Sequence, residues 1–252
     1  MYKILANTLF TGQRLVFVPE CQSTNSLLLE MASKSALPEG TVVITAHQTA
    51  GRGQRGNTWT TDANVNLTFS VLLKPNFLKA KNQFNLTMAV SLALIDFLNE
   101  ENISESKIKW PNDIIISNKK VCGILIENSL QGEAIQQSIV GIGMNINQKN
   151  FQLHTASSLS LVCNRDFDLN QVFNLLLEKL EKRYLQLRTG KVEGLKNEYL
   201  QNLLGYEIER RFISNENEFE GVIKDVSESG ELIVLSLGEK LSFKLKEISF
   251  IL

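Results

Sequence analysis

The segment QTAGRGQRGNTW, residues 48–59, combines three glycines with two arginines and contains no large aliphatic side chain. Glycine lacks a Cβ, so its backbone can adopt positive φ angles and approach a ligand closely. The planar guanidinium groups of Arg52 and Arg55 match the oxygens of a phosphate or a carboxylate. We therefore predict an anion-binding loop. By itself the segment would favour a mobile arginine-glycine turn or a patch that contacts RNA.

Four further polar clusters interrupt apolar sequence that is typical of strands. In KWPND, residues 109–113, proline disfavours helical angles at Trp110, which predicts a rigid extended turn that displays Lys109, Asn112 and Asp113. The other clusters are STN at residues 23–25, KKVCGILIE at residues 119–127 and GIGMNIN at residues 141–147. No helix-opening pattern follows the last cluster, so we favour a tight strand end there over a dinucleotide-binding loop.

The composition is that of a soluble enzyme. The chain has 252 residues, 43% of them hydrophobic, which can fill one domain of ordinary size and a smaller one. A formal net charge of −1 gives no global basic field for holding DNA or RNA. Cys21, Cys122 and Cys163 are widely spaced without a CxxC pair, so neither a disulfide framework nor a structural zinc site is indicated. Because neither a signal peptide nor a membrane span is visible, we expect a cytoplasmic protein without a membrane partner.

Hydrophobic periodicity places the polar clusters on a mixed α/β scaffold. A strand at 14–20 precedes a helix that Ser23 or Thr24 caps, so STN lies at a strand-to-helix junction. Strands at 41–48 and 65–73 flank the glycine-arginine loop. Apolar residues at helical spacing from 84 to 98 predict a buried central helix. Further strands are expected at 113–116, 122–128 and 135–143, and further helices at 169–187 and 191–203.

After Leu204 the pattern becomes β-rich again. Short strands are expected at 207–213, 219–226, 231–237 and 240–245, separated by Asn, Ser and Gly turns. About 48 residues of this kind predict a small SH3-like β-barrel. We therefore assign the chain to the α+β class, with a mixed-sheet domain at residues 1–204 and a C-terminal SH3-like domain at residues 205–252.

The ordered set GRGxRG, KWPND, GILIE and GxGxN resembles the biotin protein ligases over nearly the whole chain. The resemblance implies the catalytic fold shared by biotin and lipoate ligases, followed by the small barrel. It also implies an enzyme that activates biotin with ATP to biotinyl-5′-AMP and transfers biotin to a lysine of a biotin carboxyl carrier domain. A homodimer is compatible with this resemblance.

The implied reaction first joins two anions, which requires fixed cations and oriented donors. The cations within the matched motifs are Arg52, Arg55, Lys109 and Lys120. The resemblance places Lys120 beside the biotin carboxylate and the reacting phosphate. It places Asp113 beside the incoming amine, although a solvated turn carboxylate is the plain alternative. We therefore assign catalysis to Lys120, Arg52 and Asp113.

Biotin has a polar ureido head and an apolar tail, so its site needs hydrogen-bonding groups at one end and apolar walls elsewhere. The resemblance assigns biotin binding to Ser23, Thr24, Asn25, Gln48, Gly51, Arg52, Gly53, Gln54, Lys120, Gly123 and Ile124. It assigns ATP or adenylate binding to Arg52, Arg55, Trp59, Lys109, Asn112 and Asn145, with Mg²⁺ arriving with ATP near Asn112 rather than in a fixed protein site. A plain helix cap would also explain Ser23 or Thr24, and core packing would also explain Trp59 or Ile124.

Two departures from the family pattern affect these expectations. Gln54 replaces the arginine of the common GRGRRG loop, which removes one positive charge from the adenylate site. Only 22 residues precede Ser23, so we expect no N-terminal winged helix-turn-helix domain and no nucleic-acid partner. A lipoate ligase or related acyltransferase of the same fold is the nearest alternative function. A nucleic-acid or regulatory binding module is the second, and the neutral net charge disfavours it.

Overall fold

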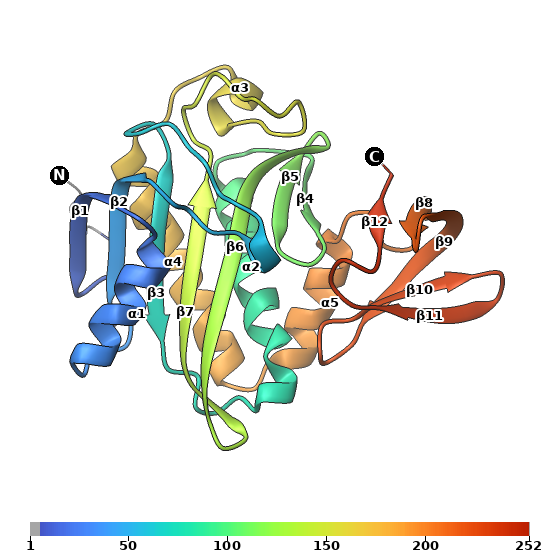
Figure 1. Ribbon diagram of the computed structural model, residues 1–252, viewed down its shortest axis with the longest axis horizontal. Helices are drawn as coiled ribbons and strands as arrows, with labels where there is room; N and C mark the ends of the chain where they lie inside the picture. The colour runs from blue at the N-terminus through green and yellow to red at the C-terminus, as the bar shows by residue number, and fades with distance from the viewer. Residues whose placement is uncertain (1–5, 252) are drawn as a thin grey trace.

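The computed structural model describes residues 6–251, which form two β-sheets with helices packed around the larger one (Figure 1). The larger sheet has seven strands in the order β1-β2-β3-β7-β6-β5-β4. Strands β1 (Leu15–Cys21) and β2 (Val42–Gln48) are parallel, and every other neighbouring pair is antiparallel. The sheet is therefore mixed, as the sequence predicted. Its other strands are β3 (Leu67–Leu73), β4 (Ser106–Lys109), β5 (Asp113–Ile116), β6 (Lys119–Gln131) and β7 (Ala134–Met144).

Helices cover both faces of this sheet (Figure 1). Helix α1 (Thr24–Lys34) packs on β2, β3 and β7, and Leu28 lies there with Val43, Leu72 and Ile139 in a small core. The opposite face carries the main core. It is covered by α2 (Phe84–Glu100), α4 (Leu169–Arg188) and α5 (Val192–Asn202). Alternate strand residues reach the two cores because successive side chains point to opposite faces of a sheet.

Two predicted helices have the properties that the sequence indicated. Ser23 caps α1 from an extended backbone, and its side chain accepts a hydrogen bond from Ser26 N at 3.5 Å. The strand-to-helix junction at STN is thereby confirmed. Helix α2 is buried almost all round, which confirms the central helix. Each fully buried leucine in it contributes about 1.5–3 kcal/mol through removal of apolar surface from water.

The C-terminal strands form an open sheet, so the predicted closed barrel is not observed among residues 6–251. The sheet order is β11-β10-β9-β8-β12, which leaves β11 (Glu239–Phe243) and β12 (Ser249–Phe250) at opposite edges. The other strands are β8 (Glu209–Ser214), β9 (Asn217–Val226) and β10 (Leu232–Ser236). Strands β8 to β11 were predicted, but hydrophobic alternation does not specify whether two edges pair with each other.

Three short elements were absent from the sequence prediction. Strand β4 has four residues, and its alternation is too short to be recognised without its partner β5. Helix α3 (Leu159–Cys163) and strand β12 are similarly short. In contrast, β6 is longer than the predicted 122–128, because it pairs with β7 along nearly its whole length.

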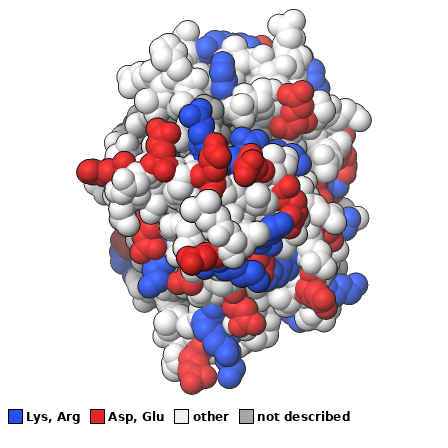
Figure 2. All heavy atoms as spheres, turned by 90° about the vertical axis from the view of Figure 1, so that its right-hand side faces the viewer, with Lys and Arg blue, Asp and Glu red and all other residues white. Residues whose placement is uncertain are grey.

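Charges of both signs are interspersed on the side of the molecule that carries the C-terminal sheet (Figure 2). That face lacks a broad basic surface of the kind that dominates nonspecific nucleic-acid binding. Among the residues that the structure describes, α-helices with the length and apolarity needed to cross a bilayer are absent.

Candidate active site

A pocket of about 340 Å³ opens over the glycine-rich part of β6 and β7. Its wall comes from four separate parts of the chain: the start of α1, the glycine-arginine loop, the turn between β4 and β5, and the end of the C-terminal sheet. The sequence-predicted site residues on this wall are Ser23, Thr24, Asn25, Gln48, Arg52, Gly53, Gln54, Trp59, Lys109, Asn112, Asp113, Lys120, Gly123 and Ile124. The fold thus brings nearly the whole predicted set together.

One end of the pocket is a neutral hydrogen-bonding cluster. The backbone N and the Oγ1 of Thr24 donate to Gln48 Oε1 at 2.7 and 3.1 Å. Ser70 Oγ lies 2.7 Å from Thr24 Oγ1 and 2.6 Å from Asn25 Oδ1. Ser23, Thr24 and Asn25 are all buried. These amide and hydroxyl groups suit a polar but uncharged ligand.

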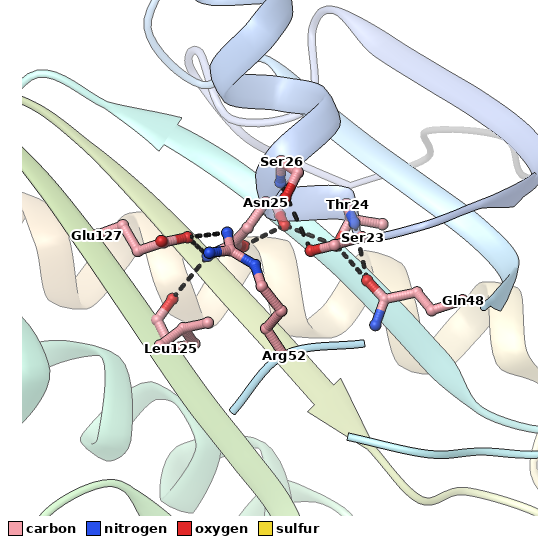
Figure 3. Close-up of polar contacts among 9 residues, drawn as sticks. Ser23, Thr24, Asn25, Ser26, Gln48, Arg52, Leu125 and Glu127 are labelled. Atoms are coloured by element: carbon pink, nitrogen blue, oxygen red, sulfur yellow. Dashed lines mark hydrogen bonds and ion pairs between the residues drawn. The ribbon is translucent and has the colours of Figure 1, made fainter. Parts of the chain in front are cut away.

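A carboxylate ties this cluster to the glycine-arginine loop (Figure 3). Asn25 Nδ2 donates to Glu127 Oε2 at 2.8 Å and to Leu125 O at 3.3 Å. Arg52 Nη2 forms an ion pair with the same Glu127 oxygen at 2.7 Å. The Arg52 side chain is 43% exposed, so it can exchange this partner for a ligand anion without unpacking a core.

Glycines make the floor of the pocket flat. Gly123 on β6 and Gly143 on β7 are cross-strand partners. A Cβ at Gly143 would lie 2.3 Å from the Trp59 ring, and a Cβ at Gly141 would lie 2.2 Å from Asn25 Oδ1. Because Gly143 and Gly141 carry no side chain, Trp59 and Asn25 can lie directly against the floor, where any larger residue would clash with them.

Lys120 stands between the neutral cluster and the turn that contains KWPND. Its Nζ lies 2.7 Å from Asp113 Oδ1 and 5.6 Å from the centroid of the Trp59 ring. Its backbone N donates to Thr155 O at 2.7 Å, and its carbonyl accepts from Ser157 N at 2.9 Å. Hydrogen bonds on both sides of its backbone thus position this lysine.

KWPND forms the turn between β4 and β5, and it is anchored from three directions. The Trp110–Pro111 peptide is cis. Asn112 Nδ2 donates to Ile124 O at 2.5 Å, and Tyr199 donates its hydroxyl to Pro111 O at 3.3 Å. Trp110 Nε1 donates to Gly230 O at 3.0 Å, which joins this turn to the C-terminal sheet. These hydrogen bonds hold the turn, and Lys109, Asn112 and Asp113 line the pocket from it, as predicted.

Three predicted residues are not on the described wall. A Cβ at Gly51 would lie 2.2 Å from Trp59 O, so this buried glycine is packed within the loop. Asn145 is 4% exposed, and its Nδ2 donates to Ser157 O at 3.0 Å. The side chain of Arg55 lies outside the described residues.

Sequence reasoning missed Ser70 and Glu127. Both are polar residues on strands whose neighbours are largely apolar, and both follow the two-residue period of the pocket face. Glu127 lies four residues after Gly123, and Ser70 lies two residues after Thr68 and opposite Gly141. This two-residue period could have identified both side chains as facing the pocket. The wall residues Leu245, Lys246, Ile248, Ser249 and Phe250 had no such signal, because they reach the pocket only through docking of the second sheet.

The wall combines an uncharged polar end with three cations from the predicted set, Arg52, Lys109 and Lys120. Such a wall can bind a ligand with a neutral polar head and bring its anionic end to a second anion. Complete burial raises the pKa of the nearby Cys122 thiol far above its usual range. Cys122 therefore has no thiolate character for covalent catalysis.

Comparison with known proteins identifies the class that this fold and pocket define. The model of the biotin/lipoate A/B protein ligase family matches residues 18–145, and the chain belongs to this family. It is 30% identical over 228 residues to the bifunctional ligase/repressor BirA of Bacillus subtilis, covering 88% of this chain and 70% of that protein. The biotin–[acetyl-CoA-carboxylase] ligase of Mycobacterium tuberculosis is 29% identical over 224 residues, covering 87% and 82% of the two chains.

Solved structures agree with this assignment. The biotin protein ligase from Aquifex aeolicus in complex with biotin and ATP superposes with a TM-score of 0.77 at 26% identity. The match covers 94% of this chain and 98% of that one. The resemblance to biotin protein ligases that the motifs indicated is thereby confirmed.

Proposed function

We propose that this protein is an ATP-dependent biotin protein ligase that forms biotinyl-5′-AMP and transfers biotin to a lysine of a biotin carboxyl carrier domain. The observation that carries this proposal is the position of Lys120. It lies on one wall with the neutral cluster around Thr24 and with the KWPND turn. The relatives named for biotin and for acetyl-CoA carboxylase, and the related structure with biotin and ATP, support the same substrates.

In this proposal the ureido head of biotin binds at the neutral cluster of Ser23, Thr24, Asn25 and Gln48. Its apolar tail crosses the floor at Gly123 and Ile124, which allows close contact because the floor glycines carry no side chains. The biotin carboxylate then reaches Lys120. Adenylate contacts come from Arg52 and Trp59 at the glycine-arginine loop, together with Gly53 and Gln54.

In the first step a biotin carboxylate oxygen attacks the α-phosphorus of ATP. The bond from that phosphorus to the bridging oxygen breaks, and its electron pair leaves with pyrophosphate. Lys120 and Arg52 offset the repulsion between the two anions, and they act more strongly on the charge that develops in the transition state. Lys109 lies on the same wall and serves the nucleotide phosphates.

The donor set at KWPND fits Mg²⁺ that arrives with ATP. Mg²⁺ prefers oxygen ligands and is usually held by one or two carboxylates together with substrate phosphates. Asn112 is held through its Nδ2, so its side-chain oxygen would be the protein ligand, and the ATP phosphates would supply the principal anionic ligands. The ion would neutralise phosphate charge when bound.

In the second step the ε-amine of the carrier lysine attacks the biotinyl carbonyl carbon, and AMP leaves with the electron pair of the broken C–O bond. Asp113 lies on the wall beside Lys120 and is proposed to orient the amine and accept its proton. The carrier lysine must therefore enter the pocket near the KWPND turn.

We also propose the division into residues 1–204 and 205–252. The end of α5 at Asn202 and the start of β8 at Glu209 support this boundary. The SH3-like assignment of the open C-terminal sheet stays a prediction, and so does the cytoplasmic location.

Incubation with biotin, ATP, Mg²⁺ and a carrier domain, followed by intact-mass measurement of the carrier, tests the function. We expect one biotinyl addition on the wild-type carrier and none on a carrier whose acceptor lysine is replaced by arginine. A parallel reaction with lipoate in place of biotin tests the nearest alternative. Modification by lipoate and not by biotin would overturn the proposal.

A further inference from the structure

The turn between β11 and β12 contains a lysine in a backbone conformation that disfavours it. Residues 244–247 form a four-residue turn in which Glu247 N donates to Lys244 O at 3.0 Å. The third residue of this turn, Lys246, has φ +73°. Glycine or asparagine ordinarily occupies that position, because a Cβ is crowded at positive φ. Among the described non-glycine residues with positive φ, Lys246 alone lines the active-site pocket.

Lys246 borders the active-site pocket, although it belongs to the C-terminal sheet. Two contacts hold this sheet against the KWPND turn. The Lys109 Nζ lies 5.9 Å from the centroid of the Phe250 ring, and Trp110 Nε1 donates to Gly230 O. Ile248 is buried two residues after Lys246. The turn is therefore fixed next to the pocket rather than projecting into solvent.

The charges on the described wall are unbalanced. Its cations are Arg52, Lys109, Lys120 and Lys246, and Asp113 is its single carboxylate. Lys246 belongs to the C-terminal sheet, and Lys109 lies against Phe250 of the same sheet, so both cations stand at the side where that sheet borders the pocket. This side is suited to a ligand part that carries several negative charges.

We propose that Lys246 binds the β- and γ-phosphates of ATP and stabilises the pyrophosphate that leaves in the first step. This inference rests on the proposed ligase function. With the biotin head at the neutral cluster and the reacting atoms at Lys120, the terminal phosphates extend toward Lys109 and Lys246. When the bond from the α-phosphorus to the bridging oxygen breaks, negative charge develops on pyrophosphate, and the ammonium group of Lys246 interacts with it.

The variant Lys246→Gly tests this role with little risk to folding, because glycine suits a positive φ. We expect an unchanged or higher melting temperature. In biotin-dependent pyrophosphate exchange, kcat/KM for ATP should fall about tenfold, the effect of one lost charged contact. Transfer from preformed biotinyl-5′-AMP to the carrier should be unchanged, because that reaction contains no β- or γ-phosphate. Lys246→Arg should retain most of the ATP-dependent activity.

The matched control is Lys240→Ala, an exposed lysine on the same sheet that is not on the pocket wall. It should behave as wild type in both assays. If the wild type is active and Lys246→Gly has an unchanged kcat/KM for ATP, the inference about Lys246 is wrong. The proposed ligase function would be unaffected by that result. A loss confined to the transfer reaction would also overturn it, because Lys246 would then serve the carrier. An inactive wild type would remove the proposed function, and this inference with it.

Discussion

Lys120 Nζ and Asp113 Oδ1 lie 2.7 Å apart on neighbouring strands. In the free protein, the lysine that we propose to contact the phosphate is therefore paired with the carboxylate that we propose to orient the carrier amine. Their side chains are 37% and 24% exposed, which leaves both accessible to a ligand. Binding of a carboxylate and a phosphate would offer Lys120 a stronger set of partners. Asp113 would then be released toward the incoming amine.

The first prediction concerns Lys120. Lys120→Ala should fold normally and lose adenylate formation by about 10²-fold or more, as expected for a preorganised electrostatic group. Lys119→Ala is the matched control, since Lys119 is exposed on the adjacent position and is not on the pocket wall. Biotin-dependent pyrophosphate release measures both variants. If Lys119→Ala is the impaired variant, the assignment of roles to these two lysines is wrong.

The second prediction separates ligand retention from stability at Arg52. Its ion pair with Glu127 is partly exposed, and pairs of this kind contribute only about 0–1 kcal/mol to stability. Arg52→Ala should therefore change the melting temperature little but shorten the lifetime of bound biotinyl-5′-AMP. Arg165→Ala removes a comparable exposed ion pair with Glu101, at 2.7 Å, and should leave that lifetime unchanged. Equal losses of melting temperature and of adenylate retention in Arg52→Ala would contradict this interpretation.

The third prediction is that residues 48–59 become more ordered when biotin and ATP bind. The loop has a short 3₁₀ turn at Gln54–Gly56 and a hydrogen bond from Gly53 N to Asn57 O at 2.7 Å. Its three glycines raise the entropic cost of a fixed shape, and a bound anion would offset that cost. Hydrogen exchange in this loop should slow on ligand addition. The hairpin turn at Gly132 is not on the pocket wall and should show no change in exchange. If exchange in residues 48–59 is also unchanged, ligand-induced ordering of the loop is refuted.

The fourth prediction concerns the glycine floor. Gly143→Ala places a Cβ 2.3 Å from the Trp59 ring and must displace that ring, so binding of the adenylate should weaken. Gly194→Ala is the contrasting substitution, because this glycine lies within α5 and a Cβ there meets no atom within 4 Å. It should raise the free energy of unfolding by about 0.4–1 kcal/mol. Titration calorimetry with a non-hydrolysable adenylate analogue and thermal unfolding measure the two effects. Normal analogue binding by Gly143→Ala would show that Trp59 does not need this position.

Local sequence determined the elements of this protein and most of its candidate site. The β-rich runs of β3 and β7 and the helical period of α2 were readable because each pattern lies within one element. The motif residues from Ser23 to Ile124 were likewise identifiable from their types and order. Parallel pairing of β1 with β2 also fits the predicted strand-helix-strand sequence.

Tertiary structure alone decided which residues meet. Glu127 contacts Asn25 and Arg52 across 102 and 75 residues of sequence, so both contacts depend on how α1 and the glycine-arginine loop pack against β6. Asn145 donates its side-chain N–H to Ser157 O, a contact that its motif did not indicate. The open C-terminal sheet and the arrival of Lys246 at the pocket depend on how two sheets dock. Such contacts join segments that are distant in sequence. Their contribution to stability therefore produces no periodic pattern within either segment.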